Sequence, residues 1–144
     1  MTRGTTPTYT LELPAGIDLG KAAQVYAAFE QGGERIVKTG EALAIRGNIV
    51  EVYLDQAETL FFTDGERVGI QLNWIYEDGT RASSRIASAP VRRNLIQMEL
   101  EGGEGGSIHM KPVTLRANGT YTAPERTAYT PVTVDLPRAY GARF

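Results

Sequence analysis

Nine consecutive residues in the middle of the chain place every second side chain on one apolar face. That face is formed by Val68, Ile70, Leu72, Trp74 and Tyr76. A period of two is what a half-buried β-strand requires, whereas an amphipathic helix repeats every three to four residues. The pair Asp78-Gly79, which is favoured in tight hairpins, follows shortly afterwards. The sequence therefore predicts a long strand and a return strand over about residues 81–91.

Strand-like patterns fill most of the first ninety residues. They give seven candidate strands, near residues 8–13, 25–31, 35–38, 43–46, 49–54, 68–76 and 81–91. We therefore expect an all-β fold, an immunoglobulin-like β-sandwich of about seven strands with a C-terminal β-arm. The chain has no cysteine for the disulfide that often links the two sheets of such a sandwich. Apolar packing has to replace it, and we expect its centre to be Trp74, Phe29, Leu11, Val52 and Ile70.

One segment is compatible with two structures. It begins at Asp18, a good helix N-cap, contains several alanines and ends at a glycine pair, so its composition favours a helix. The same residues also fit a short turn followed by a strand from Val25 to Gln31 with alternate side chains inward. Both interpretations stay open from the composition alone.

Two further segments have helical features. Asp55 and Glu58 have the spacing of a capping box, which predicts one helical turn over residues 55–60. Such a turn is a common way for a chain to cross from one sheet of a sandwich to the other. Residues 92–100, which follow the last predicted strand, fit either a short helix or a final strand.

The character of the sequence changes after the predicted sandwich. Residues 101–107 are rich in glycine and glutamate, a composition typical of a flexible linker. We therefore divide the chain into an immunoglobulin-like sandwich over 1–98, a Gly/Glu-rich linker over 99–110 and a C-terminal β-arm and tail over 111–144. An arm this short cannot easily enclose a core of its own. We expect it to mediate assembly with a neighbouring chain through Val113, Leu115, Tyr121, Tyr129, Val132, Val134, Tyr140 and Phe144.

Few residues are suited to catalysis or metal binding. With no cysteine and a single histidine, His109, the chain has neither a thiolate site nor a histidine pair. Glu77 and Asp78 lie at a hairpin tip, where turn formation explains them, and Ser83-Ser84 has no nearby base. Gly102–Gly106 lacks the lysine and the strand–loop–helix context of a phosphate-binding loop. We expect no enzymatic activity, no cofactor and no metal.

The charge balance bears on larger partners. Lys and Arg number 15 and Asp and Glu number 17, so the net charge of -2 leaves no basic surplus for nucleic acid, and Arg92-Arg93 is expected to be solvated. No apolar stretch is long enough to span a bilayer, and Met1–Pro7 lacks the apolar run of a secretory signal. We expect neither a nucleic acid nor a membrane as partner.

Two sets of motifs occur together in the chain. The first comprises Arg3-Gly4-Thr5-Thr6-Pro7-Thr8, Ile17-Asp18-Leu19, Val25-Tyr26, Phe29 and Leu54-Asp55-Gln56-Ala57-Glu58-Thr59-Leu60. This set covers most of residues 3–91 and resembles a group of small proteins encoded in tailed phages and prophages of Firmicutes. The second comprises Lys111-Pro112-Val113-Thr114, Asn118-Gly119-Thr120-Tyr121-Thr122-Ala123-Pro124 and Tyr129-Thr130-Pro131-Val132-Thr133-Val134. It is similar to a segment that recurs in phage structural proteins beside tail or fibre modules. The resemblance implies a virion structural role without enzymatic activity, and it favours the strand for Val25–Gln31.

These features lead to one main functional hypothesis and two alternatives. The main one is a tail, baseplate or adaptor component of a tailed-phage virion that forms a homo-oligomer and docks onto other virion structural proteins after assembly in the bacterial cytoplasm. The first alternative is a capsid decoration or head-fibre base protein. The second is a carbohydrate- or receptor-binding module, which would recognise a host surface glycan through Tyr26, Trp74, Tyr76, Tyr121 and Tyr129.

Overall fold

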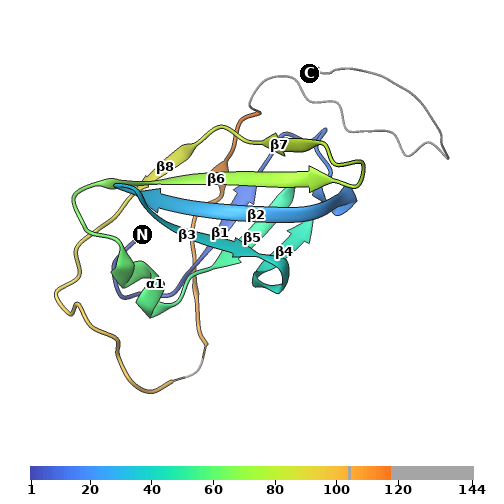
Figure 1. Cartoon of the computed structure of the whole chain (residues 1–144). Coiled ribbons are helices and arrows are strands. Elements are labelled where there is room, and N and C mark those ends of the chain that lie inside the picture. Colours follow the sequence, from blue (N-terminus) through green and yellow to red (C-terminus); the bar gives the residue numbers. More distant parts are fainter. Residues whose placement is uncertain (104, 118–144) are drawn as a thin grey trace.

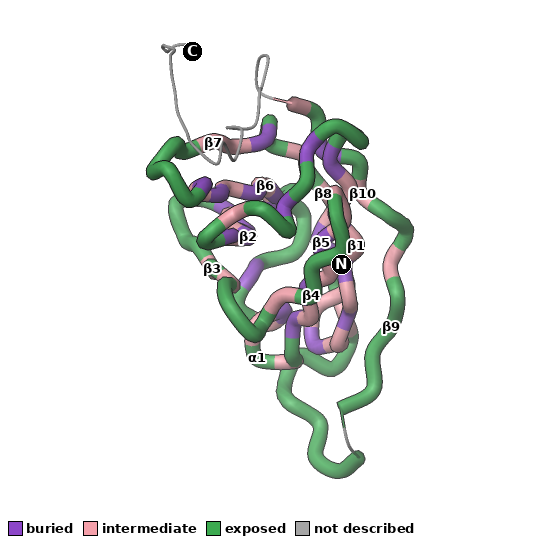
Figure 2. The backbone as a smooth tube through the Cα atoms, turned by 90° about the vertical axis from the view of Figure 1, so that its right-hand side faces the viewer, coloured by how far each residue is buried: buried purple, intermediate pink, exposed green. Residues whose placement is uncertain are grey.

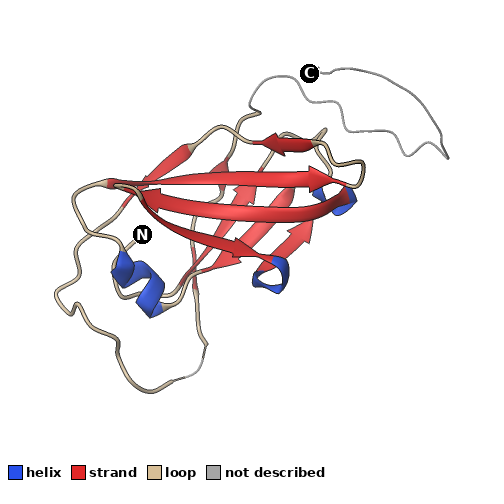
Figure 3. Ribbon diagram, in the orientation of Figure 1, coloured by secondary structure: helices blue, strands red, loops and turns tan. Residues whose placement is uncertain are grey.

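Two β-sheets packed face to face make up the body of the molecule in this computed structural model, which describes residues 1–103 and 105–117 (Figure 1, Figure 3). The expected all-β fold is confirmed. The strands are β1 (Pro7–Glu12), β2 (Ala22–Gln31), β3 (Glu34–Thr39), β4 (Leu43–Arg46), β5 (Ile49–Tyr53), β6 (Arg67–Tyr76), β7 (Arg81–Ser83), β8 (Ala87–Pro90), β9 (Ile108–His109) and β10 (Val113–Thr114). The short helices are η1 (Leu19–Lys21), η2 (Gly40–Ala42) and α1 (Gln56–Phe61).

The chain crosses repeatedly between the two sheets. One sheet has the order β10-β1-β5-β4, with β9 also paired to β1, and the other has the order β3-β2-β6-β7, with β8 paired to β6. The β1–β5 and β2–β6 pairs are antiparallel, whereas β9 and β10 run parallel to β1. Each of the first three crossings contains one of the short helices, so the expected role of residues 55–60 agrees with the position of α1.

The core lies between β1 and β5 on one side and β2 and β6 on the other. Along these strands buried and outward-facing residues alternate, and the buried segments face one another across the sandwich (Figure 2). All five residues expected at the centre of the core are at most 1% exposed: Trp74, Phe29, Leu11, Val52 and Ile70. This part of the prediction is confirmed. The Tyr9 ring packs on Phe29 with centroids 5.7 Å apart.

The segment with two possible structures is a strand. Asp18 caps only the single turn η1, where its carboxylate accepts from the Gly20 amide at 2.9 Å. The chain then runs as β2 into a two-residue hairpin in which Gly32 and Gly33 have φ values of 57° and 87°. Positive φ at both positions matches the right-handed twist of the strands and favours glycine. Pairing with β6 and burial of alternate side chains between the two sheets override the helical preference of the alanines.

The expected return strand over 81–91 is interrupted. Ser84 separates β7 from β8 and is fully buried, and its hydroxyl accepts from the Leu72 amide at 3.1 Å and donates to the Arg85 carbonyl at 2.9 Å. The Arg85 amide is turned away from β6 and donates to the Arg116 carbonyl at 2.9 Å. A buried polar side chain thus satisfies the backbone where the strand pairing breaks.

The C-terminal segment corrects the expected domain boundaries. The linker expected over 99–110 contains β9, and both β9 and β10 extend the sheet along β1 of the same chain. Leu115 is 1% exposed and belongs to the main core, with Val113 packed partly against it. Val113 and Leu115 therefore lie in the sandwich and not in an arm, because an apolar strand beside an unpaired edge of β1 is most stable when it covers that edge.

We predict that Leu115→Ala lowers the free energy of unfolding by about 2–5 kcal/mol, because it empties a fully buried site. Ile108→Ala, a control in β9 at a side chain that is mostly exposed, is expected to change it by less than about 0.5 kcal/mol. Urea unfolding followed by circular dichroism measures both. Equal, small effects would show that the C-terminal segment does not belong to the core.

One buried polar group lacks a partner. The Tyr9 side chain is 2% exposed, and its hydroxyl has no hydrogen-bond partner among the described residues. Burial raises the pKa of the Tyr9 phenol to about 12 from its usual 10.0, because the ionised form is disfavoured away from water. Between these two pH values the unfolded chain loses the proton while the folded chain retains it, so the stability contributed by Tyr9 falls as pH rises through this range.

We predict that Tyr9→Phe is as stable as the natural chain at pH 7, or more stable by up to about 1 kcal/mol, since a buried and unsatisfied hydroxyl is removed. The variant should also lose less stability between neutral and strongly alkaline pH. Urea titrations at neutral pH and at a pH between 10 and 12 test both statements. A clear loss of stability at pH 7 would mean that the hydroxyl makes a favourable interaction.

Candidate interaction surface

Four exposed apolar side chains lie close together in the connection between β8 and β9. We call residues 95–100 the apolar segment; it forms part of the long loop that passes below α1 in Figure 1. Leu95 is 88% exposed and Met98 65%, while Ile96 and Leu100 are each about half exposed. Single exposed apolar residues are normal on protein surfaces, but four within six residues form a patch of the kind that marks interaction sites.

Hydrogen bonds hold both ends of the apolar segment against the body. At its start, the Asn94 side-chain amide donates to the Arg3 carbonyl at 2.9 Å. At its end, the Gln56 side chain accepts from the Leu100 amide at 2.6 Å and donates to the Leu100 carbonyl at 3.1 Å. Gln56 thus pairs with this loop residue as a neighbouring strand would. The segment is presented in a defined position although its side chains face solvent.

The support beneath the segment is built from the N-terminal turn and α1. The buried Thr59 hydroxyl of α1 accepts from the Gly4 amide and donates to the Thr5 carbonyl, both at 2.9 Å. The Arg3 guanidinium donates to the carbonyls of Leu60 and Phe62 at 2.9 and 2.6 Å, which satisfies the last turn of the helix. These contacts join two parts of the chain more than fifty residues apart.

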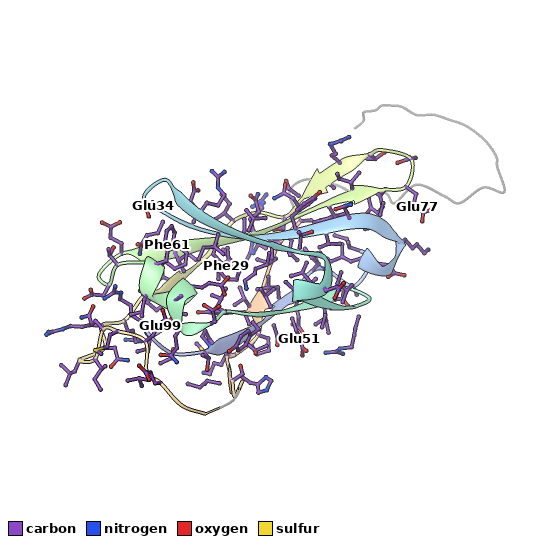
Figure 4. The ribbon with its side chains drawn as sticks, turned by 60° about the horizontal axis from the view of Figure 1, so that its bottom comes forward. Phe29, Glu34, Glu51, Phe61, Glu77 and Glu99 are labelled. Atoms are coloured by element: carbon purple, nitrogen blue, oxygen red, sulfur yellow. The ribbon has the colours of Figure 1, made fainter. Side chains whose placement is uncertain are left out.

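The helix itself is fixed at its other end by the expected capping box. The Asp55 carboxylate accepts from the Glu58 amide at 2.8 Å, and the Glu58 carboxylate accepts from the Asp55 amide at 2.9 Å. Glu58 also pairs with Lys38 of β3 at 2.7 Å. The next turn presents Phe61, which is 44% exposed and stacks edge-on against the buried Phe62. Figure 4 shows Phe61 on α1 and Glu99 on the loop at the same end of the molecule.

Charged residues flank the apolar segment with opposite signs at its two ends. Arg92 and Arg93 precede it, while Glu99 and Glu101 lie at or beyond its end, and all four are exposed. Within residues 1–103 and 105–117 none of these four side chains takes part in an ion pair. The surface therefore has an apolar middle, a positive start and a negative end.

Sequence reasoning did not identify this surface. The segment is neither the helix nor the final strand expected over 92–100. Ile96, Met98 and Leu100 alternate with polar residues as in a strand, and Leu95 beside Ile96 interrupts this alternation. The interruption is the signal that was available, because side chains that pack against one core face would repeat regularly.

The residues expected to form the assembly arm divide into two groups. Val113 and Leu115 lie in the sandwich, as described above. The others fall outside the described residues: Tyr121, Tyr129, Val132, Val134, Tyr140 and Phe144.

The three described residues of the aromatic platform expected for a glycan do not lie on one surface. Trp74 and Tyr76 are buried on the inner face of β6, whereas Tyr26 lies on the outer face of β2 and donates to the Gln24 side chain at 2.9 Å. These side chains lie on opposite faces of one sheet and cannot present a shared flat surface. Tyr121 and Tyr129 lie outside the described residues.

The remaining residues considered for chemistry have local structural roles or are exposed. Asp78 accepts from the Thr80 amide at 2.8 Å in the β6–β7 hairpin, as turn chemistry requires. Ser84 is buried and its hydroxyl is engaged with the backbone. His109 is exposed on β9. In the described part of the chain, no group of three or more histidine or acidic side chains is arranged to hold a metal ion.

One shallow cavity of about 200 Å³ opens where β2 begins, beside η2 and β4. Its lining is Leu19, Ala22, Ala23, Gln24, Val25, Thr39, Gly40 and Ile45. The polar side chains in this lining are an amide and a hydroxyl, and none of the eight residues is ionisable. The cavity therefore offers a recess of mixed polarity without an acid or a base.

Comparisons with protein-family models, curated proteins and solved structures produced no match. Within the described residues, no helix has the length and apolar character needed to cross a membrane.

We predict that Gln56→Ala releases the end of the apolar segment, because it removes both hydrogen bonds to Leu100. Amide hydrogen exchange at Leu100 and its neighbours should become about tenfold faster, equivalent to about 1.4 kcal/mol of local opening. Gln97→Ala, at an exposed glutamine of the segment itself, is the matched control and should leave exchange unchanged. Unaltered exchange in Gln56→Ala would show that these hydrogen bonds do not hold the loop.

Proposed function

We propose that the chain is a non-enzymatic structural protein of a tailed-phage virion, positioned in the tail or baseplate region as an adaptor between neighbouring virion proteins. The sandwich serves as the docking body. The observation that carries the proposal is the apolar segment, which is exposed and yet fixed at both ends to the N-terminal turn and α1. An apolar surface held in a fixed position in this way suits a protein that binds another protein.

The proposal includes an immunoglobulin-like identity for the sandwich. The order β1-β5-β4 in one sheet and β3-β2-β6-β7 in the other matches strands B-E-D and C′-C-F-G of that fold. Two features differ from antibody domains: the buried tryptophan lies on β6, in the position of strand F, and the chain has no disulfide. The place beside strand B is taken by β9 and β10, which run parallel to β1.

The resemblance of residues 3–91 and of the C-terminal motifs to phage proteins supports the virion assignment. The role expected of the arm is proposed here for the part of the chain beyond Ala117, since Val113 and Leu115 belong to the body. Tethering such a second contact to a docked body raises its effective concentration and strengthens the overall attachment without new contacts at the first site.

The direct test is to purify intact particles of the phage that encodes the chain and to search for it by mass spectrometry. We expect it in the particles, and in isolated tails after heads and tails are separated. Recovery with heads alone would favour the capsid-decoration alternative, and absence from intact particles would overturn the proposal. Cryo-electron microscopy of the same particles would then locate the copies.

A paired variant connects incorporation to the surface. Leu95→Asp with Met98→Asp places two charges on side chains that are mostly exposed, so the fold should be retained while incorporation falls at least tenfold. Ile86→Asp, at an exposed apolar residue between β7 and β8, is the matched control and should be incorporated normally. Normal incorporation of the double variant would exclude the apolar segment as the docking surface.

A further inference from the structure

We propose that the partner of the apolar segment is a second copy of this chain, bound antiparallel across a two-fold axis. This inference rests on the assembly role proposed above and names the occupant of that surface. It is carried by the order of charges around the apolar residues: positive at 92 and 93, apolar from 95 to 100, and negative at 99 and 101. A two-fold axis brings one patch of a protein onto the same patch of its copy.

The antiparallel orientation satisfies the apolar and the charged residues together. When Leu95 of one copy lies opposite Met98 of the other, the same register places Arg92 opposite Glu101. Sliding the copies by one residue places Arg93 opposite Glu99, so the match of charges does not depend on a single register. A parallel orientation would instead set arginine against arginine and glutamate against glutamate, which disfavours it.

The free charges fit this arrangement. None of Arg92, Arg93, Glu99 and Glu101 forms an ion pair within the part of the chain that the structure describes, so all four are accessible to a second molecule. Leu95 and Met98 would meet at the centre of the interface. They are the two most exposed apolar side chains of the segment. The interface would thus have an apolar centre and a charged rim, the usual anatomy of protein interfaces.

The size of the surface sets the expected affinity. Residues 92–101 and Phe61 are fewer than the roughly 20–30 residues that each side of a standard interface contributes. The dimer is therefore expected to be weak, with a Kd of about 10–100 μM. A weak self-contact of this kind becomes effective when many copies are held together on a particle. Because hydrogen bonds already hold both ends of the segment, less conformational entropy is lost on binding.

Sedimentation equilibrium of the full chain over about 1–500 μM tests the inference. We expect a concentration-dependent monomer–dimer equilibrium, weakened at least tenfold by Leu95→Asp with Met98→Asp and unchanged by Ile86→Asp. A monomer at every concentration, or a dimer that the double variant leaves intact, would overturn the proposal. Circular dichroism melting of each variant verifies that the fold is retained.

Charge exchange tests the orientation. Variant one carries Arg92→Glu and Arg93→Glu, and variant two carries Glu99→Arg and Glu101→Arg; each should be monomeric alone, and their mixture should dimerise. A third variant with all four substitutions should dimerise with itself and not with the natural chain. Pairing between the third variant and the natural chain would refute the antiparallel orientation, because only a parallel arrangement matches those charges.

The two proposals fail in different experiments. A chain that is monomeric in solution but present in particles would overturn the self-contact and leave the virion role in place, with a different virion protein covering the segment. A chain that dimerises as expected but is absent from particles would overturn the virion role and leave the self-contact in place.

Discussion

The contact between the two inner sheet faces is the interaction on which the rest of the molecule depends. Without a disulfide, the sheets are held mainly by apolar side chains, with Trp74 and Phe29 on one sheet and Leu11 and Val52 on the other. Complete burial of such side chains contributes about 1.5–3 kcal/mol each. It also sets the strand registers, because a slip of one residue would turn the apolar face of a strand outward. β1 occupies a special position, since β5 covers one of its edges and the C-terminal segment covers the other.

The buried polar contacts depend on this apolar core, and they fix the loops that leave the strands and helices. Thr59, Gln31 and Ser84 are the buried polar residues of the described chain, and each bonds to backbone groups where the chain leaves a regular element. Gln31, for example, donates to the carbonyls of Thr63 and Glu66 and accepts from the Thr63 amide, which fixes the approach to β6. Satisfied buried groups of this kind give a loop one conformation at little energetic cost.

The sequence predicted the features that residues close together in the chain decide, and it missed those that distant residues decide. Strict alternation identified β6 and the core around Trp74, and the Asp55–Glu58 spacing identified α1, because both patterns are decided by neighbours in the sequence. Residues 22–31 were ambiguous because alanine fits a helix, and only pairing with β6 and burial between the two sheets decide for a strand. Leu115 was placed in an arm because its partner, the edge of β1, lies a hundred residues away in the chain. Non-local pairing of this kind leaves no local pattern to detect.

The candidate surface was hidden for a related reason. An apolar residue in an irregular stretch looks the same in a sequence whether a core covers it or solvent does, and the hydrogen bonds from Gln56 and Asn94 that decide between these cases join distant segments. Because those bonds fix the segment, its exposed apolar side chains form a defined surface. A mobile apolar loop would lose conformational entropy on binding, whereas a loop already tied to α1 and the N-terminal turn has lost much of it during folding. The stability of the sandwich, which holds α1 in place, therefore also holds the exposed apolar segment in one position.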